Sequence, residues 1–263
     1  MPIQIPANFS LDAYCRRINY VGKLKPDLET LNAIVFNHVR NIAFENLDVV
    51  ARKIVSINPE EICDKILNSH RGGYCYEVNG LFSFALAAIG FEFQYVFARP
   101  MYYPMARPKT HMAIVVTLCG EKYLCDMGFG SSGPRLPLLL DSDAARDGYE
   151  ITQECETFRL SIIERNHFLL EALVNGEFLK QYSFDLYEAE WIDFEPANYL
   201  NSTHPDSAFL RGAIVVKITD GGRKIIRGGV FKTIENGKVN ERVFAPNELD
   251  DVLSQEFGLK IKE

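Results

Sequence analysis

The pattern of apolar residues changes at Gly90, and this change restricts the possible folds of the chain more than any other feature. Before Gly90, apolar residues recur at the three- and four-residue spacing of amphipathic helices. After it, short runs rich in aromatic and β-branched residues are separated by turn residues, as is typical of strands. Helices followed by strands predict an α+β fold rather than an alternating α/β fold.

The helical part carries recognisable start and stop signals. Ser10, Asp27 and Asn58 each precede an apolar helical pattern, and their short polar side chains favour the cap position of a helix. A further helix is expected to begin near Cys75, directly after a pair of glycines. Gly90 is expected to end it, because glycine readily adopts the left-handed conformation that closes helices.

The remainder of the chain predicts strands joined by tight turns. Asn175-Gly176 and Asn236-Gly237 are strong signals for two-residue hairpin loops. Between the strand patterns, residues 193–212 are polar and interrupted by prolines, and we interpret them as a linker. A helical segment, a β-rich segment and a smaller α/β end are therefore expected.

Composition excludes several classes of protein. The 263 residues are 47% apolar and 24% charged, as expected for a globular chain. The net charge of -7 argues against a nucleic-acid partner. No run of 18 apolar residues and no signal-peptide pattern is present, so we expect a cytoplasmic protein with no membrane contact. A chain of this length can form a core without disulfides, so we expect the six cysteines to be free thiols. They have no C-x-x-C spacing and the five histidines are scattered, so we expect no metal site.

Cys75 is the first candidate for chemistry. It lies in "RGGYCYEVNG" (71–80), where Gly72-Gly73 interrupts the chain and a helix pattern follows. Unpaired N–H groups and the positive end of the helix dipole meet in such a first turn, and they lower the pKa of a thiol. Cys75 is thus a candidate nucleophile; the alternative is a small residue of the core.

A cysteine nucleophile needs a base and a group that orients it. His111 begins "THMAIVV", and Asp126 lies in "YLCDMGFG" beyond a turn at Gly120. If Leu118 pairs with Tyr123, the side chains of His111 and Asp126 lie on the same face of the sheet. They are then separated by four residues along the strands, about 13 Å. The pattern leaves open that the histidine bonds a backbone carbonyl and that the aspartate merely flanks a turn.

A glycine-rich stretch follows the aspartate. "GFGSSG" (128–133) lacks the Lys-Ser/Thr pair that makes a phosphate loop specific. We interpret it as a turn whose backbone N–H groups are available to an anion.

Five segments in order resemble the arylamine N-acetyltransferase family in its bacterial form. They are "IAFENLDV" (42–49), "RGGYCYEVNG" (71–80), "THMAIVV" (110–116), "YLCDMGFG" (123–130) and "NSTHPDSAF" (201–209). The resemblance implies a helical domain over 1–91, a β-barrel domain over 92–196, and a linker with an α/β lid over 197–263. This chain departs from the family at Tyr76, at Ser131-Ser132, and in ending early, at Glu263.

The resemblance also implies roles for individual residues. It implies a papain-like Cys-His-Asp triad of Cys75, His111 and Asp126. Aromatic walls for the acceptor map onto Phe44, Phe129 and Phe209, and contacts with the acyl donor onto Thr110, Gly130 and Ser131. Arg71 and Glu45 are expected to support the site structurally rather than to react.

The implied reaction moves an acetyl group from acetyl-CoA through a cysteine thioester to an arylamine, a hydrazine or an N-hydroxyarylamine. An alternative keeps the triad but takes its acyl chain from an acyl carrier protein or another thioester, as an amide synthase of secondary metabolism. A non-catalytic binding module on the same scaffold is disfavoured by the three triad residues, and a cysteine protease by the five segments.

Overall fold

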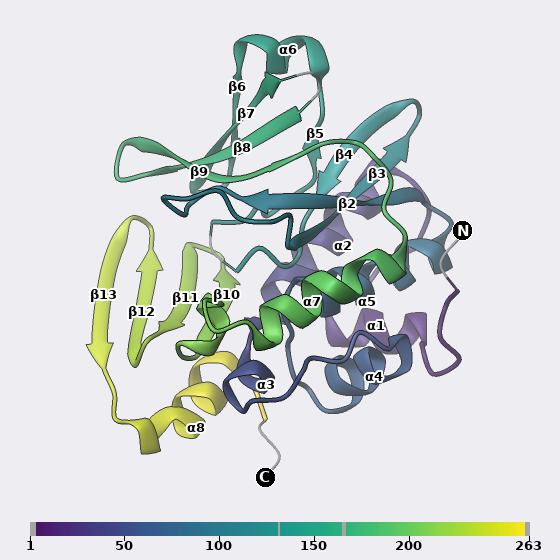
Figure 1. The fold of residues 1–263 in the computed structure, drawn as a ribbon. Helices are drawn as coiled ribbons and strands as arrows, with labels where there is room; N and C mark the ends of the chain where they lie inside the picture. The colour runs from purple at the N-terminus through teal and green to yellow at the C-terminus, as the bar shows by residue number, and fades with distance from the viewer. Residues whose placement is uncertain (1–3, 131, 165–166, 261–263) are drawn as a thin grey trace.

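The computed structural model describes residues 4–130, 132–164 and 167–260. Figure 1 shows a group of helices in the centre and lower right, a large curved sheet above them, and a second sheet at the left. The predicted combination of helices followed by strands is therefore confirmed. Among the described residues, no helix is long and apolar enough to cross a bilayer.

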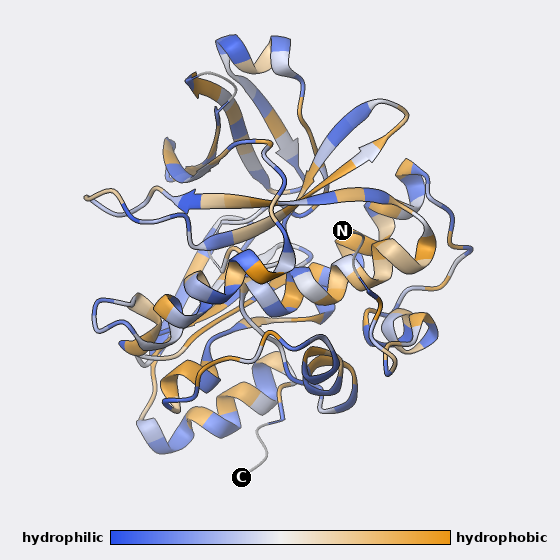
Figure 2. Ribbon diagram, turned by 45° about the vertical axis from the view of Figure 1, so that its right-hand side comes forward, coloured by the Kyte–Doolittle hydropathy of each residue, from blue (hydrophilic) through white to orange (hydrophobic). Residues whose placement is uncertain are grey.

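The first part of the chain folds into short helices. Their bounds are α1 Leu11–Arg17, α2 Leu28–Asn41, α3 Leu47–Val50, α4 Pro59–Cys63 and α5 Cys75–Ile89, with a π-helical turn at Asp64–Asn68. The predicted caps are confirmed, since Ser10, Asp27 and Asn58 each accept a bond from a first-turn N–H. Gly90 ends α5 with a φ of 97°. Figure 2 shows hydrophobic and hydrophilic residues on the same outer helices, as amphipathic packing requires.

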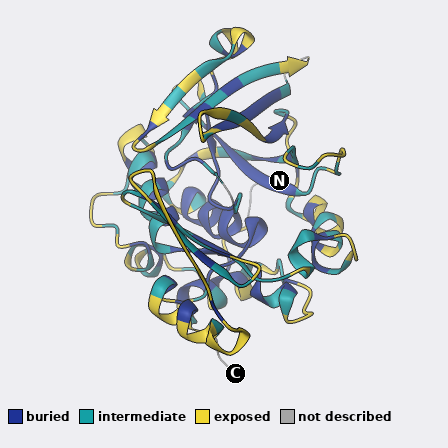
Figure 3. Cartoon of the chain, turned by 90° about the vertical axis from the view of Figure 1, so that its left-hand side faces the viewer, coloured by how far each residue is buried: buried dark blue, intermediate teal, exposed yellow. Residues whose placement is uncertain are grey.

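Helix α5 lies at the centre of the molecule. Twelve of its residues, from Cys75 to Leu86, are buried, and it packs against the outer helices on one side and strand β3 (His111–Leu118) on the other. Figure 3 shows that buried residues concentrate in the middle of the molecule and exposed ones at its periphery. A helix that is apolar on nearly every face needs such enclosure.

A large antiparallel sheet follows. Within the described residues it has eight strands in the order β5-β4-β3-β2-β9-β8-β7-β6. Their bounds are β2 Glu92–Pro100, β3 His111–Leu118, β4 Glu121–Cys125, β5 Leu138–Leu139, β6 Tyr149–Gln153, β7 Glu156–Glu164, β8 His167–Val174 and β9 Glu177–Phe184. Helix α6 (Ser142–Asp147) lies between β5 and β6 in the chain. The sheet curls into a nearly closed barrel with its own apolar core, and the Tyr149 hydroxyl donates to the Leu139 carbonyl between its edge strands.

The register of the β3–β4 hairpin differs from the expected one. Leu118 pairs with Glu121 rather than with Tyr123, because Cys119 and Gly120 form a two-residue loop with φ values of 52° and 85°. Positive φ at both loop residues matches the turn that follows the natural twist of a hairpin. The expected register was wrong by two residues, which preserves the face of every side chain and halves the separation of His111 from Asp126 along the strands.

A second, smaller sheet completes the fold. Its strands lie in the order β1-β10-β11-β12-β13, with bounds β1 Phe44–Glu45, β10 Ile214–Thr219, β11 Gly222–Arg227, β12 Val230–Glu235 and β13 Lys238–Val243. Helix α8 (Leu249–Val252) and a π-helical turn at Leu253–Phe257 pack on it. Strand β1 belongs to the helical part of the chain, so this sheet ties the last part of the chain to the first. The hairpins at Asn175-Gly176 and Asn236-Gly237 are confirmed.

Residues 193–212 connect the two sheets, as expected of a linker, but they are not the irregular segment that their polarity and prolines indicated. Most of this segment is helical, with α7 at Phe194–Thr203 crossing the front of the molecule in Figure 1. Phe194, Asn198 and Asn201 share one buried face of α7. The polar residues tolerate burial because they find partners; the Asn198 amide, for example, donates to the Val55 carbonyl at 2.8 Å. Polarity therefore misled the interpretation.

Candidate active site

Cys75 is the first residue of α5, and its side chain is nearly buried, at 3% exposure. The glycines before it let the chain pair with β1: Glu45 N–H donates to the Gly73 carbonyl at 3.0 Å. A Cβ at Gly72 would lie 2.0 Å from the Ala43 carbonyl oxygen, so no larger residue fits there. The glycine pair thus fixes the helix start against the sheet.

A second glycine allows the barrel to reach Cys75. A Cβ at Gly128 would lie 2.6 Å from the Cα of Cys75 and 2.7 Å from a methyl group of Val78. The loop that follows β4 therefore packs directly on the first turn of α5, which is possible only without a side chain at this position.

His111 and Asp126 meet beside this turn. His111 Nε2 lies 2.7 Å from Asp126 Oδ2, and both residues are at most 4% exposed. The second carboxylate oxygen accepts bonds from the Gly128 N–H at 2.9 Å and from Asn79 Nδ2 at 3.2 Å. The carboxylate is thus fully occupied, as a buried charge must be.

The electrostatics of this pair favour its charged form. Burial alone would lower the pKa of His111, but the Asp126 carboxylate and the hydrogen-bonded Cys75 thiol raise it well above its usual range. Burial would raise the pKa of Asp126, but His111 and the donors Gly128 and Asn79 hold it below its usual range. Cys75 and His111 line the same cavity, and the interaction of the thiol with the imidazole contributes to the raised pKa of His111.

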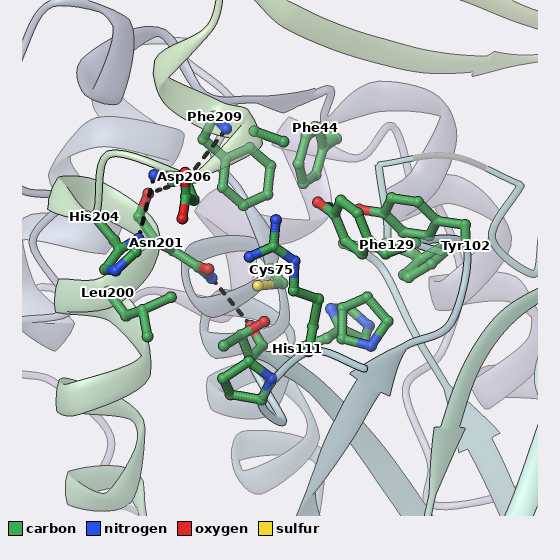
Figure 4. Close-up of a pocket in the computed structure, with 18 residues that line it drawn as sticks. Phe44, Cys75, Tyr102, His111, Phe129, Leu200, Asn201, His204, Asp206 and Phe209 are labelled. Atoms are coloured by element: carbon green, nitrogen blue, oxygen red, sulfur yellow. Dashed lines mark hydrogen bonds between the residues drawn. The ribbon is translucent and has the colours of Figure 1, made fainter. Parts of the chain in front are cut away.

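A cavity opens at the thiol (Figure 4). Its lining includes Cys75, His111 and four other residues singled out from the sequence, Phe44, Phe129, Phe209 and Thr110. The Phe129 ring packs edge-on against the imidazole at 5.1 Å, and the rings of Phe44 and Phe209 lie 6.2 Å apart. The cavity at the sulfur is thus lined by several aromatic rings.

Two sequence-predicted positions remain, and one of them, Gly130, is not among the described residues that line this cavity. Gly130 lies behind Phe44, where a Cβ would be 2.6 Å from the phenylalanine ring. Ser131 lies outside the described residues.

Asn79 is the residue that sequence reasoning missed. Besides its bond to Asp126, its amide nitrogen donates to the Met112 carbonyl at 2.8 Å, and its amide oxygen accepts from the Met127 N–H at 2.8 Å. It therefore joins α5 to β3 and to the loop that follows β4. A signal was available, because Asn79 follows Cys75 by four residues and so lies on the same helix face.

Two ion pairs stabilise the start of α5 and the segment before it. Arg71 lies 2.8 Å from Glu45, and Lys65 lies 2.6 Å from Glu77. The other oxygen of Glu77 accepts the Tyr74 N–H at 3.0 Å, next to Cys75. Arg71 and Glu45 thus contact the segment that holds the thiol without reaching the cavity themselves.

Comparisons with known proteins agree with this geometry. A model of the N-acetyltransferase family matches residues 27–263. The arylamine N-acetyltransferase of Mycobacterium tuberculosis is 33% identical over 263 residues, which cover 96% of this chain and 90% of that protein. The chain belongs to the arylamine N-acetyltransferase family. It is accordingly an acyltransferase.

Solved structures of this family share the fold. The arylamine N-acetyltransferase from Mycobacterium abscessus superposes with a TM-score of 0.89 at 31% identity, covering 97% of this chain and 91% of that one. The enzyme from Mycobacterium marinum, solved in complex with CoA, superposes with a TM-score of 0.87 at 30% identity, covering 95% and 93%. The mixed architecture with a nearly closed barrel is thus that of arylamine N-acetyltransferases.

Proposed function

We propose that the protein transfers an acetyl group from acetyl-CoA to an arylamine, a hydrazine or an N-hydroxyarylamine through a thioester on Cys75. The observation that supports the proposal is a cavity lined by both the Cys75 thiol and a buried imidazole that is itself paired with a carboxylate. Nucleophile, base and orienting group are the three parts that covalent acyl transfer requires.

In the first half-reaction, His111 takes the proton of the Cys75 thiol, and the thiolate attacks the carbonyl carbon of the donor thioester. The tetrahedral intermediate collapses, the bond to the CoA sulfur breaks, and the imidazolium returns its proton to that sulfur. Asp126 fixes the tautomer of the ring and stabilises its positive charge.

In the second half-reaction, the acceptor nitrogen or oxygen attacks the thioester carbon and His111 accepts its proton. The Cys75–carbon bond breaks and the thiolate forms again, paired with the imidazolium. The Cys75 N–H is a candidate donor to the oxyanion in both steps, because the first N–H groups of a helix have no intrahelical acceptor.

The cavity suits these substrates. Phe44, Phe129 and Phe209 offer aromatic faces to an arylamine. The CoA complex of the Mycobacterium marinum relative supports a CoA thioester as the donor, with Thr110 at the cavity as its expected contact. Both relatives with solved structures and the Mycobacterium tuberculosis relative are named as arylamine N-acetyltransferases, which gives no support to a carrier-protein donor.

Mass spectrometry of the intact protein tests the proposal. Brief exposure to acetyl-CoA is expected to add one acetyl group at Cys75, and a subsequent arylamine is expected to remove it and to appear acetylated. Exposure to longer acyl-CoAs in parallel shows which acyl groups the cavity accepts. Stable protein without an acetyl adduct, or an adduct that no amine removes, would contradict the proposed thioester route.

A further inference from the structure

One wall of the cavity has no part in the proposed chemistry. It is formed by residues 101–109 of the connection between β2 and β3, which contribute Tyr102, Tyr103 and Arg107 to the lining. Arg107 and Asp206 carry opposite charges among the described residues that line the cavity. No ion pair joins them. The guanidinium of Arg107 is thus a cation in the same cavity as the Cys75 thiol, without a carboxylate partner there.

The backbone that carries Arg107 is held at several points. Met101 N–H donates to the Gln181 carbonyl at 2.8 Å where the connection leaves β2. The Arg99 side chain donates to the carbonyl of Arg107 itself. At the other end, the Tyr76 hydroxyl donates to the Thr110 carbonyl at 2.7 Å. The Arg107 side chain is thus presented from a fixed base.

The Arg107 side chain makes no ion pair with a carboxylate of the described residues, whereas nearby Lys109 pairs with Asp185. Its guanidinium carbon lies 4.9 Å from the centre of the Tyr103 ring. Stacking on an aromatic ring orients a guanidinium and leaves its N–H edge available for a planar anion.

We propose that Arg107 binds a carboxylate group on a small-molecule substrate of the proposed acyl transfer. A guanidinium matches a carboxylate with two parallel hydrogen bonds. A carboxylate fits better than a phosphate here, because Asp206 lines the same cavity and repels a dianion more strongly than a monoanion. The carboxylate belongs either to the arylamine or to the far end of the acyl group. This inference rests on the proposed function.

Matched pairs of substrates test the proposal. The acceptor arm compares 4-aminobenzoate with 4-methylaniline, and the donor arm compares succinyl-CoA with butyryl-CoA. In the arm whose substrate Arg107 binds, Arg107→Met is expected to lower kcat/KM at least about tenfold for the substrate with the carboxylate. For the neutral substrate of the same pair, kcat/KM is expected to fall less than about twofold. The arm that responds identifies which substrate carries the carboxylate.

Arg227→Met is the matched control. Arg227 is an exposed cation outside the cavity lining, and its charge acts on the hydroxyl of Tyr102, which lines the cavity. Its loss removes the same charge from the same neighbourhood, so it is expected to change every kcat/KM less than twofold. An equal response of the two variants would point to general electrostatic attraction and overturn the proposal.

Other outcomes also overturn it. If Arg107→Met raises the KM of all acyl-CoAs equally and spares the acceptors, Arg107 serves the phosphates of CoA. If neither arm responds, it binds no substrate anion. Calorimetry of the four ligands on Cys75→Ala protein, with and without Arg107→Met, needs no transfer. It therefore decides the inference separately, whereas a wild-type protein that gains no acetyl mass contradicts only the proposed function.

Discussion

The two sides of the cavity around Cys75 differ in how firmly their polar groups are held. On the inner side, the imidazole of His111, the carboxylate of Asp126 and the amide of Asn79 are buried and joined by hydrogen bonds of 2.7–3.2 Å. Their donors and acceptors come from α5 and from the β3–β4 hairpin, two elements that pack directly on each other. This side is preorganised before any substrate arrives.

The outer side is more open. Tyr102 is 46% exposed, and its hydroxyl bonds only to the neighbouring hydroxyl of Tyr103, at 3.2 Å, among the described residues. Arg107 and Asp206 line the cavity without pairing with each other. The comparison suggests that reactivity depends on the inner side, where polar groups are already satisfied, and selectivity on the outer side, where they are available. Substitutions of the buried residues on the inner side should therefore lower activity more than substitutions of the exposed residues on the outer side.

The largest effect is expected for Cys75→Ala. Transfer should fall by at least about 10⁴-fold, as loss of a nucleophile does in comparable enzymes, while the unfolding temperature stays close to that of the wild type. Steady-state kinetics and thermal unfolding measure the two. Cys63→Ala is the matched control, because Cys63 is equally buried in the helical part but its pKa is raised to about 12, by burial and by nearby acids. Comparable losses for both variants would remove Cys75 from its proposed role.

Asp126→Asn is expected to lower the rate of acetylation about 10²- to 10⁴-fold, because the amide no longer fixes the imidazole tautomer or its charge. Single-turnover mass spectrometry measures the acetylation step directly. Asp141→Asn, at the exposed start of α6, provides the control. An Asp126→Asn protein that acetylates at the wild-type rate would show that His111 works without its carboxylate.

Asn79→Ala is expected to act at an intermediate level. It removes a donor to Asp126 and leaves the Met127 N–H without its acceptor, which costs about 1–3 kcal/mol of unfolding free energy. The rate of transfer should fall about tenfold, with a shift in its pH profile. Ser83→Ala, farther along α5, should destabilise without that shift, since its hydroxyl bonds Gly80 and Tyr95 instead. Identical pH profiles for both variants would reduce Asn79 to a packing role.

The His111–Asp126 pair should also contribute stability that depends on pH. The lowered pKa of Asp126 stabilises the fold above pH 3.8, and this contribution is lost as the pH falls through the folded value. The raised pKa of His111 stabilises the fold fully below pH 6.5, and this contribution is lost as the pH rises through the folded value. Denaturant unfolding of the wild type and of His111→Gln should therefore differ most between pH 3.8 and 6.5. A constant difference across pH 4–10 would speak against a charged pair.

The smallest effect is expected for Tyr102→Phe. The variant loses one exposed hydrogen bond and keeps the ring that packs on Phe129 at 5.9 Å. The value of kcat/KM should stay within about threefold of the wild-type value, and the free energy of unfolding within about 0.5 kcal/mol of it. A loss as large as that of Asn79→Ala would mean that the outer side takes part in the chemistry.

Local signals in the sequence were sufficient for many elements. The caps at Ser10, Asp27 and Asn58 and the hairpins at Asn175-Gly176 and Asn236-Gly237 were predictable, because neighbouring residues alone decide them. The turn at Gly120 was expected, but its two-residue length was not, because Cys119 takes a positive φ that cysteine rarely adopts. The helix α7 was missed because its buried asparagines are satisfied by partners far away in the chain, such as Val55.

The sequence by itself determined which residues start helices, where strands turn, and which five segments resemble a family of acyltransferases. Only the tertiary structure decided that Cys75 and His111 line one cavity and that Asn79 bonds Asp126. It also decided that Arg107 faces the same cavity. The physical reason is that caps and turns depend on a few consecutive residues. The distance between α5 and the hairpin, in contrast, depends on strand register, on the glycines that allow close packing, and on partners remote in the chain.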